Sequence, residues 1–311
     1  MGPILVTGAA GFAGSHLLDL LRREDRPIIG WYHPGTTAPP VPITWQSMEL
    51  LDPIAVREAL AKMRPAEVYH LAGVASQGKS WDRVDETLQV NVMGTEHLLD
   101  GLVQAGVPAR TLVIGSATVY RPSNEALDET APIGPASPYA VSKLAQELVA
   151  QQVFTRHRLP VMVARSFNHI GPRQGLGFVG ADFARQIALI EAGRMPPVMG
   201  VGNLDALRDL MDVRDTARAY RALMRAGTPG SAYNVCAGRA IKMRELLDGL
   251  LRHATVQVDV RVDPDKFRPV DQPIVLGSFE RLSRETGWQP EIPMDRTLGD
   301  LLDYWRGQAH A

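Results

Sequence analysis

Short apolar runs alternate with amphipathic stretches along the first half of this chain. Between the runs, apolar residues recur every three or four positions, the spacing of a helix that packs one face on a core. Strands that alternate with helices predict a parallel sheet with both faces covered, an α/β, Rossmann-like doubly wound fold. The predicted strands are 3–7, 27–32, 43–48, 67–71, 111–114 and 161–166, and the predicted helices are 15–23, the stretch from Asp52, about 81–105 and the stretch around Tyr139.

The alternation breaks after Ser166, where turns rich in glycine and proline begin. We expect the segment 213–235, a helix followed by a strand, to return to the large sheet. The predicted dinucleotide-binding Rossmann domain therefore comprises 1–166 plus about 213–236, and a smaller C-terminal α/β substrate-binding lobe comprises about 167–212 plus 237–311. Further helices are predicted at about 182–192, after Asp215, at 243–252 and at 297–305.

The composition is that of a globular protein whose partner is a small molecule. The chain has 311 residues, of which 45% are hydrophobic, enough for a sizeable core. Its formal net charge of −1 provides no basic field, so we expect neither nucleic acid nor a membrane as a partner. A single cysteine excludes an internal disulfide, the first residues lack an export signal, and the eight histidines lack metal-ligand spacing. We therefore expect a cytoplasmic protein without a metal.

A glycine turn follows the first predicted strand. Gly8, Gly11 and Gly14 are spaced by three and lead into the helical pattern at 15–23. Glycines at this spacing let the backbone turn tightly and let a pyrophosphate approach it, while the following helix offers unpaired N–H groups. Because the turn comes directly after the first strand of a chain long enough for a whole sheet, it predicts a dinucleotide-binding site rather than an ordinary glycine-rich turn.

Two further features predict a catalytic site. Tyr139 and Lys143 are four positions apart, so on a helix their side chains lie on one face. We expect the ammonium to lower the pKa of the phenol towards neutral pH, although a solvated lysine beside a half-buried tyrosine gives the same spacing. Ser116 follows the run 111–114, at the sheet edge where ligands of open α/β sheets bind, and its alternative role is to cap the loop that follows.

Taken in order, the glycine turn, Asn91, Ser116 and the pair Tyr139 and Lys143 resemble the extended short-chain dehydrogenase/reductase family of nucleotide-sugar enzymes. The resemblance covers essentially the whole chain and is most specific to the branch that reduces GDP-4-keto-6-deoxy-D-mannose. It implies NAD(P)H-dependent reduction of the C4 keto group of a nucleotide-linked 4-keto-6-deoxy hexose, with GDP-6-deoxy-D-mannose as product, and a homodimer formed through four helices. The segments that carry the closer resemblance are 165–172, 202–209, 212–215, 233–238 and 267–270.

The resemblance also implies a role for each site residue. Tyr139 would protonate the C4 oxygen as hydride arrives from the nicotinamide, Lys143 would hold the nicotinamide ribose, and Ser116 would polarise the carbonyl. The implied substrate-binding residues are Ser116, Asn168, Val179, Asn203, Arg208 and Arg268. The implied cofactor-binding residues are Gly8, Gly11, Phe12, Ala13, Gly14, His33, Glu49, Leu50, Leu71, Ala72, Gly73, Asn91, Tyr139 and Lys143.

Three positions depart from the family patterns. Thr118 stands two positions after Ser116, where the dehydratases of the family have an acidic base, which argues for a reductase or an epimerase rather than a dehydratase. His33 stands where an acidic residue would bind the ribose of NAD and repel the 2′-phosphate of NADP. NADP is therefore slightly favoured over NAD, although no arginine is present there to hold the phosphate. Glu49 replaces the usual aspartate beside the adenine.

The sequence leaves other assignments open. The catalytic set is shared by nucleotide-sugar 4-epimerases, which keep NAD tightly bound. A remote alternative is a non-catalytic dinucleotide sensor, although such a protein is expected to lose the tyrosine or the lysine. The resemblance places the dimer interface on the helices at about 81–105 and 139–156. On the second of these, Leu144, Leu148 and Val149 could serve either the subunit surface or the core.

Local alternatives also apply to the charged residues near the predicted substrate site. Arg208 is flanked by Asp205 and Asp209, so an ion pair is the alternative to substrate binding. For Asp212 and Asp215, capping of the following helix is expected instead of substrate contact.

Overall fold

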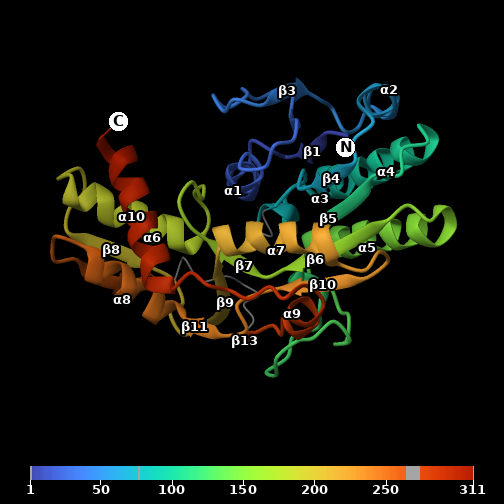
Figure 1. Cartoon of the computed structure of the whole chain (residues 1–311). Coiled ribbons are helices and arrows are strands. Elements are labelled where there is room, and N and C mark those ends of the chain that lie inside the picture. Colours follow the sequence, from blue (N-terminus) through green and yellow to red (C-terminus); the bar gives the residue numbers. More distant parts are fainter. Residues whose placement is uncertain (1, 76–77, 264–273, 311) are drawn as a thin grey trace.

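Seven parallel strands form the main sheet of the protein. The structure is a computed structural model that describes residues 2–75, 78–263 and 274–310. The strands of the main sheet are β1 (Ile4–Thr7), β2 (Ile28–Tyr32), β3 (Thr44–Ser47), β4 (Glu67–His70), β5 (Arg110–Ser116), β6 (Val161–Ser166) and β10 (Ala232–Val235). They lie in the order β10-β6-β5-β4-β1-β2-β3 and all neighbours are parallel, which confirms the predicted α/β fold (Figure 1).

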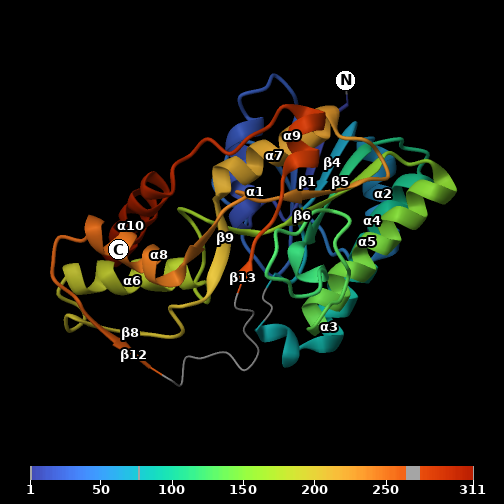
Figure 2. The same ribbon diagram turned by 90° about the horizontal axis from the view of Figure 1, so that it is seen from below.

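Helices cover both faces of this sheet (Figures 1 and 2). One face carries α2 (Pro53–Met63), α4 (Gly94–Gln104) and α5 (Pro138–His157), and the other carries α1 (Phe12–Leu21), α7 (Val213–Ala226) and α9 (Glu280–Thr286). Leu60 and Leu98 belong to the buried cluster on the first face, whereas Leu18, Tyr220 and Leu282 belong to the cluster on the second. Among the helices that the structure describes, none is long and apolar enough to cross a membrane.

The predicted helix over about 81–105 is divided in the structure. The chain there forms η1 (Lys79–Trp81), α3 (Val84–Leu88), η2 (Gln89–Met93) and then α4, and η2 is a single π-type turn. Such turns widen a helix and often occur at functional sites. Elsewhere, α1 begins at Phe12, three residues before the predicted start, and the short helix α9 was not predicted.

A second group of elements packs around its own core beside the main sheet. Strand β9 (Leu207–Asp212) pairs with β7 (Asn168–Ile170), β11 (Ala240–Lys242) and β13 (Ile274–Val275), and β12 (Asp259–Val262) pairs with β8 (Val198–Val201). Helices α6 (Val179–Glu191), α8 (Met243–His253) and α10 (Met294–His310) pack with them. Their buried residues, among them Ile187, Leu246 and Leu301, form a separate cluster.

The chain returns from this group to the main sheet, as predicted for 213–235. Helix α7 leads into β10, which pairs in parallel with β6. Asp212 caps α7 by accepting from the Arg214 N–H at 2.7 Å, as expected. Asp215 has a different role, because its carboxylate accepts from the N–H groups of Glu291 and Ile292 and so ties the segment before α10 to α7. The division of the chain into two domains at the stated bounds stays a prediction.

Candidate active site

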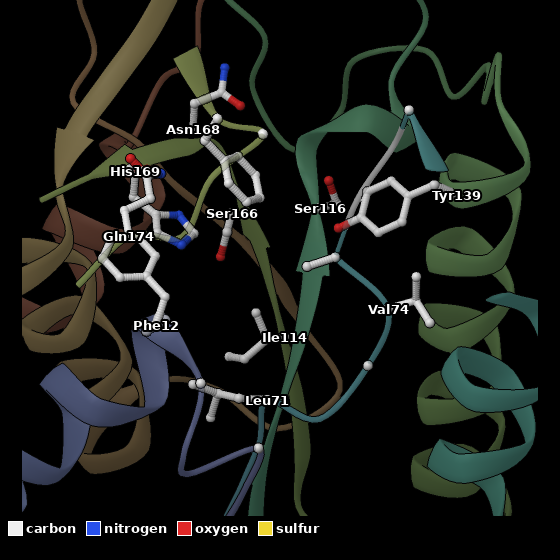
Figure 3. A pocket seen from close by; sticks show the side chains of 18 of the residues that line it. Phe12, Leu71, Val74, Ile114, Ser116, Tyr139, Ser166, Asn168, His169 and Gln174 are labelled. Atoms are coloured by element: carbon white, nitrogen blue, oxygen red, sulfur yellow. The ribbon is translucent and has the colours of Figure 1, made fainter. Parts of the chain in front are cut away.

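A cleft opens at the carboxyl edge of the main sheet, between the sheet and the second group of elements. Its volume is about 2120 Å³. Every predicted site residue that the structure describes lines it, with the exception of Asn91. Arg268 lies outside the described residues, as does the segment 267–270. Figure 3 shows side chains of β5, α5 and the segment after β6 directed into this space.

The glycine turn between β1 and α1 forms one wall of the cleft. Gly8 has a φ of +65°, and a Cβ there would lie 2.7 Å from the Ala72 nitrogen. A Cβ on Gly14 would lie 2.3 Å from the Gly8 carbonyl oxygen. Only glycine lets the turn, α1 and the end of β4 approach so closely, and the approach leaves the α1 N-terminus open to a phosphate. The turn therefore fits the pyrophosphate of a dinucleotide.

Replacing Gly14 with alanine tests this turn. The added methyl group meets backbone atoms, so the turn must shift, at a cost of about 1–3 kcal/mol in folding stability. We expect a lower melting temperature and weaker NADPH binding, measured by thermal unfolding and calorimetric titration. Gly307→Ala in α10 is the matched control, because a Cβ there meets nothing within 4 Å. Equal behaviour of the two variants would show that the turn tolerates a side chain.

Helix α5 places Tyr139 opposite Ser116. The helix begins where the Ser137 hydroxyl accepts from the Ala140 N–H at 3.1 Å, and Pro138 occupies its first position. In Figure 3 the Tyr139 ring points from α5 towards Ser116 at the end of β5. The two side chains are hydrogen-bonded.

Thr118 orients the Ser116 hydroxyl. The Ser116 oxygen accepts from the Thr118 hydroxyl at 2.9 Å and from the Thr118 N–H at 3.2 Å. With both of these donors directed at its oxygen, Ser116 is left to donate its own proton into the cleft. The serine thus caps the short helix η3 (Ala117–Val119), the alternative considered from sequence, and also presents a donor beside Tyr139. A threonine at this position supplies no carboxylate base.

The pKa of Tyr139 is shifted in the opposite direction to the sequence-based expectation. Burial raises it, while the hydrogen bond with Ser116 acts to lower it. Lys143, whose Nζ lies 6.0 Å from the centre of the tyrosine ring, is not among the causes of the shift. The ammonium donates instead to the Ile114 carbonyl at 2.9 Å and to Gln146 Oε1 at 2.8 Å. In this structure Tyr139 is therefore a neutral phenol that is ready to donate a proton.

Lys143 retains one N–H for a ligand. An ammonium has three donors, and two of them are bound as described above. Within the described part of the chain, no further partner of this nitrogen is found, and a Cβ on Gly73 would lie only 3.6 Å from it. The residue lines the cleft beside the segment Leu71–Gly73. This arrangement fits a ribose hydroxyl of a bound dinucleotide.

The charge of Lys143 predicts a pH dependence. Burial lowers its pKa to about 8, so the ammonium loses its proton as the pH rises through this value. The neutral amine is a weaker donor to a ribose hydroxyl, and we expect NADPH binding to weaken above about pH 8. Calorimetric titrations on both sides of this pH measure the effect. An affinity that stays constant across it would contradict the assigned contact.

Asn91 lies beneath the cleft and does not line it. Its Oδ1 accepts from the Val74 N–H at 2.8 Å, and its Nδ2 donates to the Ser142 hydroxyl at 2.9 Å. The residue is fully buried. It joins the segment after β4 to α5, so it positions two walls of the cleft, and the structure brings no atom of its side chain to the surface of the cleft.

The end of the cleft predicted to hold the adenosine is lined by a histidine, a glutamate and two threonines. His33 follows β2, and its Nε2 lies 3.4 Å from Glu49 Oε2, while Glu49 Oε1 accepts from the Leu51 N–H. Thr36 and Thr37 complete this end, and neither arginine nor lysine is among the described residues that line it. The carboxylate of Glu49 is thus engaged within the protein, and a 2′-phosphate would meet hydroxyl groups and an imidazole.

The predicted substrate residues come together at the opposite end. Asn168 in β7, Val179 in α6, Asn203 and Arg208 all line the cleft. The carboxylate of Asp209 accepts from the backbone N–H groups of Ala237, Gly238 and Gly277, so this aspartate is not engaged with Arg208. The Arg208 guanidinium itself donates to the Leu207 carbonyl at 2.8 Å.

Sequence reasoning missed three polar residues that line the middle of the cleft. His169 stacks on Phe12 with 5.6 Å between the ring centres, and the Gln174 amide donates to the His169 carbonyl (Figure 3). Ser166 ends β6 and lies 2.7 Å from the Tyr220 hydroxyl. The available signal was the end of the predicted strand 161–166, which Ser166 closes and His169 follows by three positions, at the sheet edge where ligands bind. Gln174 lies further along the chain and had no such signal.

Known proteins are similar to this chain over nearly its whole length. A family model described as GDP-mannose 4,6 dehydratase matches residues 5–301. The GDP-6-deoxy-D-mannose reductase of Pseudomonas aeruginosa is 38% identical, covering 98% of this chain and 97% of that protein. The solved structure of RMD from Pseudomonas aeruginosa complexed with NADPH is 36% identical with a TM-score of 0.88, covering 99% of this chain and 100% of that one. The UDP-glucose 4-epimerase of Thermus thermophilus complexed with NAD is 28% identical with a TM-score of 0.87, covering 98% of this chain and 99% of that one.

Proposed function

The chain belongs to the GDP-mannose 4,6 dehydratase family, and on this basis we propose that it reduces the C4 keto group of a nucleotide-linked 4-keto-6-deoxy hexose with NAD(P)H. The expected reaction converts GDP-4-keto-6-deoxy-D-mannose into GDP-6-deoxy-D-mannose. The observation that carries the proposal is the hydrogen-bonded pair of Ser116 and Tyr139 in the wall of the cleft, with the Lys143 ammonium 6.0 Å from the centre of the tyrosine ring. The 38% identical reductase supports the choice of substrate.

The three side chains divide the work of the reduction. When bound, a reduced nicotinamide supplies a hydride to C4. Ser116 donates a hydrogen bond to the keto oxygen, where negative charge develops. Tyr139 gives its proton to the same oxygen, so that the carbonyl becomes a secondary alcohol, and the phenolate regains a proton from solvent. Lys143 holds the ribose through the N–H that Ile114 and Gln146 leave available.

Thr118 favours reduction over dehydration. Elimination of water needs a base near C5, and the dehydratases of the family have an acidic residue two positions after the active-site hydroxyl. Here that position is occupied by a threonine whose hydroxyl binds Ser116. The chain thus belongs to a family named for dehydratases, but the residues of its site support a reductase.

We favour NADP over NAD as the cofactor. No carboxylate follows β2 at His33 to repel a 2′-phosphate, and the 36% identical structure was solved with NADPH.

We also propose a cytoplasmic homodimer that forms through α3 and α5. Leu148 is 55% exposed and Val141 is 45% exposed on α5, and Val84 of α3 is 38% exposed. Apolar side chains at such exposure on neighbouring helices support an interface. Leu144 and Val149, in contrast, pack against interior clusters. Sedimentation of the protein at several concentrations would test the assembly.

An assay with freshly prepared GDP-4-keto-6-deoxy-D-mannose tests the reaction. We expect the absorbance of NADPH to fall in proportion to the sugar added, and NADH to serve less well. An epimerase would behave differently, since it retains its cofactor and consumes none. Absence of net NADPH oxidation together with interconversion of nucleotide hexoses would overturn the proposal.

A further inference from the structure

A network of hydrogen-bonded, buried polar side chains leads from Lys143 to β1, the strand before the glycine turn. Lys143 Nζ donates to Gln146 Oε1 at 2.8 Å, and Gln146 Nε2 donates to Thr95 Oγ1 at 2.8 Å. Thr95 Oγ1 lies 2.9 Å from His70 Nε2, and His70 Nδ1 lies 2.8 Å from Thr7 Oγ1. The last four of these residues have no exposed surface. The network therefore connects helices α5 and α4 with strands β4 and β1 through the interior.

The direction of each hydrogen bond follows from Thr95. Its hydroxyl donates to the Asn91 carbonyl at 2.7 Å, so its oxygen accepts from both Gln146 and His70. His70 therefore carries its proton on Nε2 and accepts from Thr7 on Nδ1. Burial lowers the pKa of His70 to about 3, which keeps the ring neutral. Each side-chain nitrogen and oxygen of this network thus has at least one partner, and the tautomer of the histidine is determined.

This arrangement holds Lys143 and cannot relay its proton. Because Thr95 accepts from both sides, a proton cannot pass through it from one end of the network to the other. The far end is equally anchored, since the Thr7 oxygen accepts from the Ala72 N–H at 3.1 Å, beside Gly8. The network thereby connects the lysine with the backbone beside the glycine turn, which forms one wall of the cleft.

We propose that Gln146, itself held by Thr95 and His70, is a positioning residue that fixes the Lys143 ammonium at the floor of the cleft. The inference rests on the proposed function for the role of Lys143. Gln146 supplies one of the two acceptors of this buried ammonium, so its loss leaves a charged donor unsatisfied and free to turn away. A glutamate at the same position keeps the acceptor and adds an opposite charge.

Two variants of Gln146 test the proposal with dinucleotide binding as the readout. Gln146→Leu removes the acceptor, and we expect NADPH affinity to fall by about tenfold, the usual effect of one hydrogen bond to a charged group. The pH at which binding weakens should move below that of the wild type in Gln146→Leu and above it in Gln146→Glu. The titratable side chains that face Lys143 are Tyr139, whose pKa is raised, and His70, which stays neutral across this range.

Matched variants separate positioning from general damage. Gln152→Leu makes the same change at an exposed site of α5 and should bind NADPH as the wild type does. His70→Gln retains a donor and an acceptor and should bind NADPH better than His70→Leu. Opposite pH shifts in the two Gln146 variants support the proposal, and an unchanged pH profile in both overturns it. If the two variants show these opposite pH shifts but the protein does not reduce the keto sugar, the proposed function is refuted and the role of Gln146 stands.

Discussion

Tyr139→Phe is expected to lower kcat on the keto sugar by about a hundredfold or more, the usual contribution of a placed proton donor. The phenyl ring still fills the half-buried site on α5, so the fold and NADPH binding should survive. Ser116 can still polarise the carbonyl, but no tyrosine hydroxyl remains to protonate the keto oxygen as the hydride arrives. Steady-state kinetics at saturating NADPH would show the loss in kcat, with a smaller change in KM.

A second tyrosine provides the control for this variant. Tyr304 lies in α10 and does not line the cleft, so Tyr304→Phe should retain full turnover. Wild-type turnover in Tyr139→Phe would show that the proton comes from another group and would remove the assignment of the acid.

Lys143→Ala is expected to weaken NADPH binding and to lower kcat together, with kcat/KM reduced by about a hundredfold or more. The variant loses the donor that faces the ribose and leaves the Ile114 carbonyl and Gln146 Oε1 without their buried partner. Calorimetry would report the change in affinity, and single-turnover kinetics would report the change in the chemical step.

Two control variants separate the effect of the Lys143 charge from the effect of its volume. Lys62→Ala removes an exposed lysine from α2 and should leave both quantities unchanged. Lys143→Met refills the space without restoring the charge, and it should bind NADPH as poorly as the alanine variant. A methionine variant with normal affinity would mean that volume, and not the ammonium, matters at this position.

The layout of the main sheet followed from the sequence because its signals are local. The apolar run before Gly8, the run at 161–166 and the helical pattern from Asp52 each marked an element within a few residues of its observed bounds. The glycine turn and Ser116 were placed correctly at the cleft because ligands of open parallel sheets bind at the carboxyl ends of the strands.

Features that depend on three-dimensional contacts could not be predicted in this way. The spacing of Tyr139 and Lys143 suggested direct pairing, but the ammonium binds Ile114 and Gln146, and burial then dominates the pKa of the tyrosine. Likewise, spacing put Asn91 in a helix but gave no indication that a π-type turn would bury it beneath the cleft. The link from His70 to Lys143 joins residues 73 positions apart through Thr95, a contact that no local pattern reveals.

Transfer of a labelled hydride tests the central claim most directly. The protein would be incubated with GDP-4-keto-6-deoxy-D-mannose and NADPH that carries deuterium on the transferable position of the nicotinamide, and the product would be examined by NMR. A reductase with this site places one deuterium at C4 of the product for each NADPH consumed, and the configuration at C4 is read from the same spectrum. A product without deuterium at C4, or a sugar interconverted without consumption of NADPH, would contradict the account.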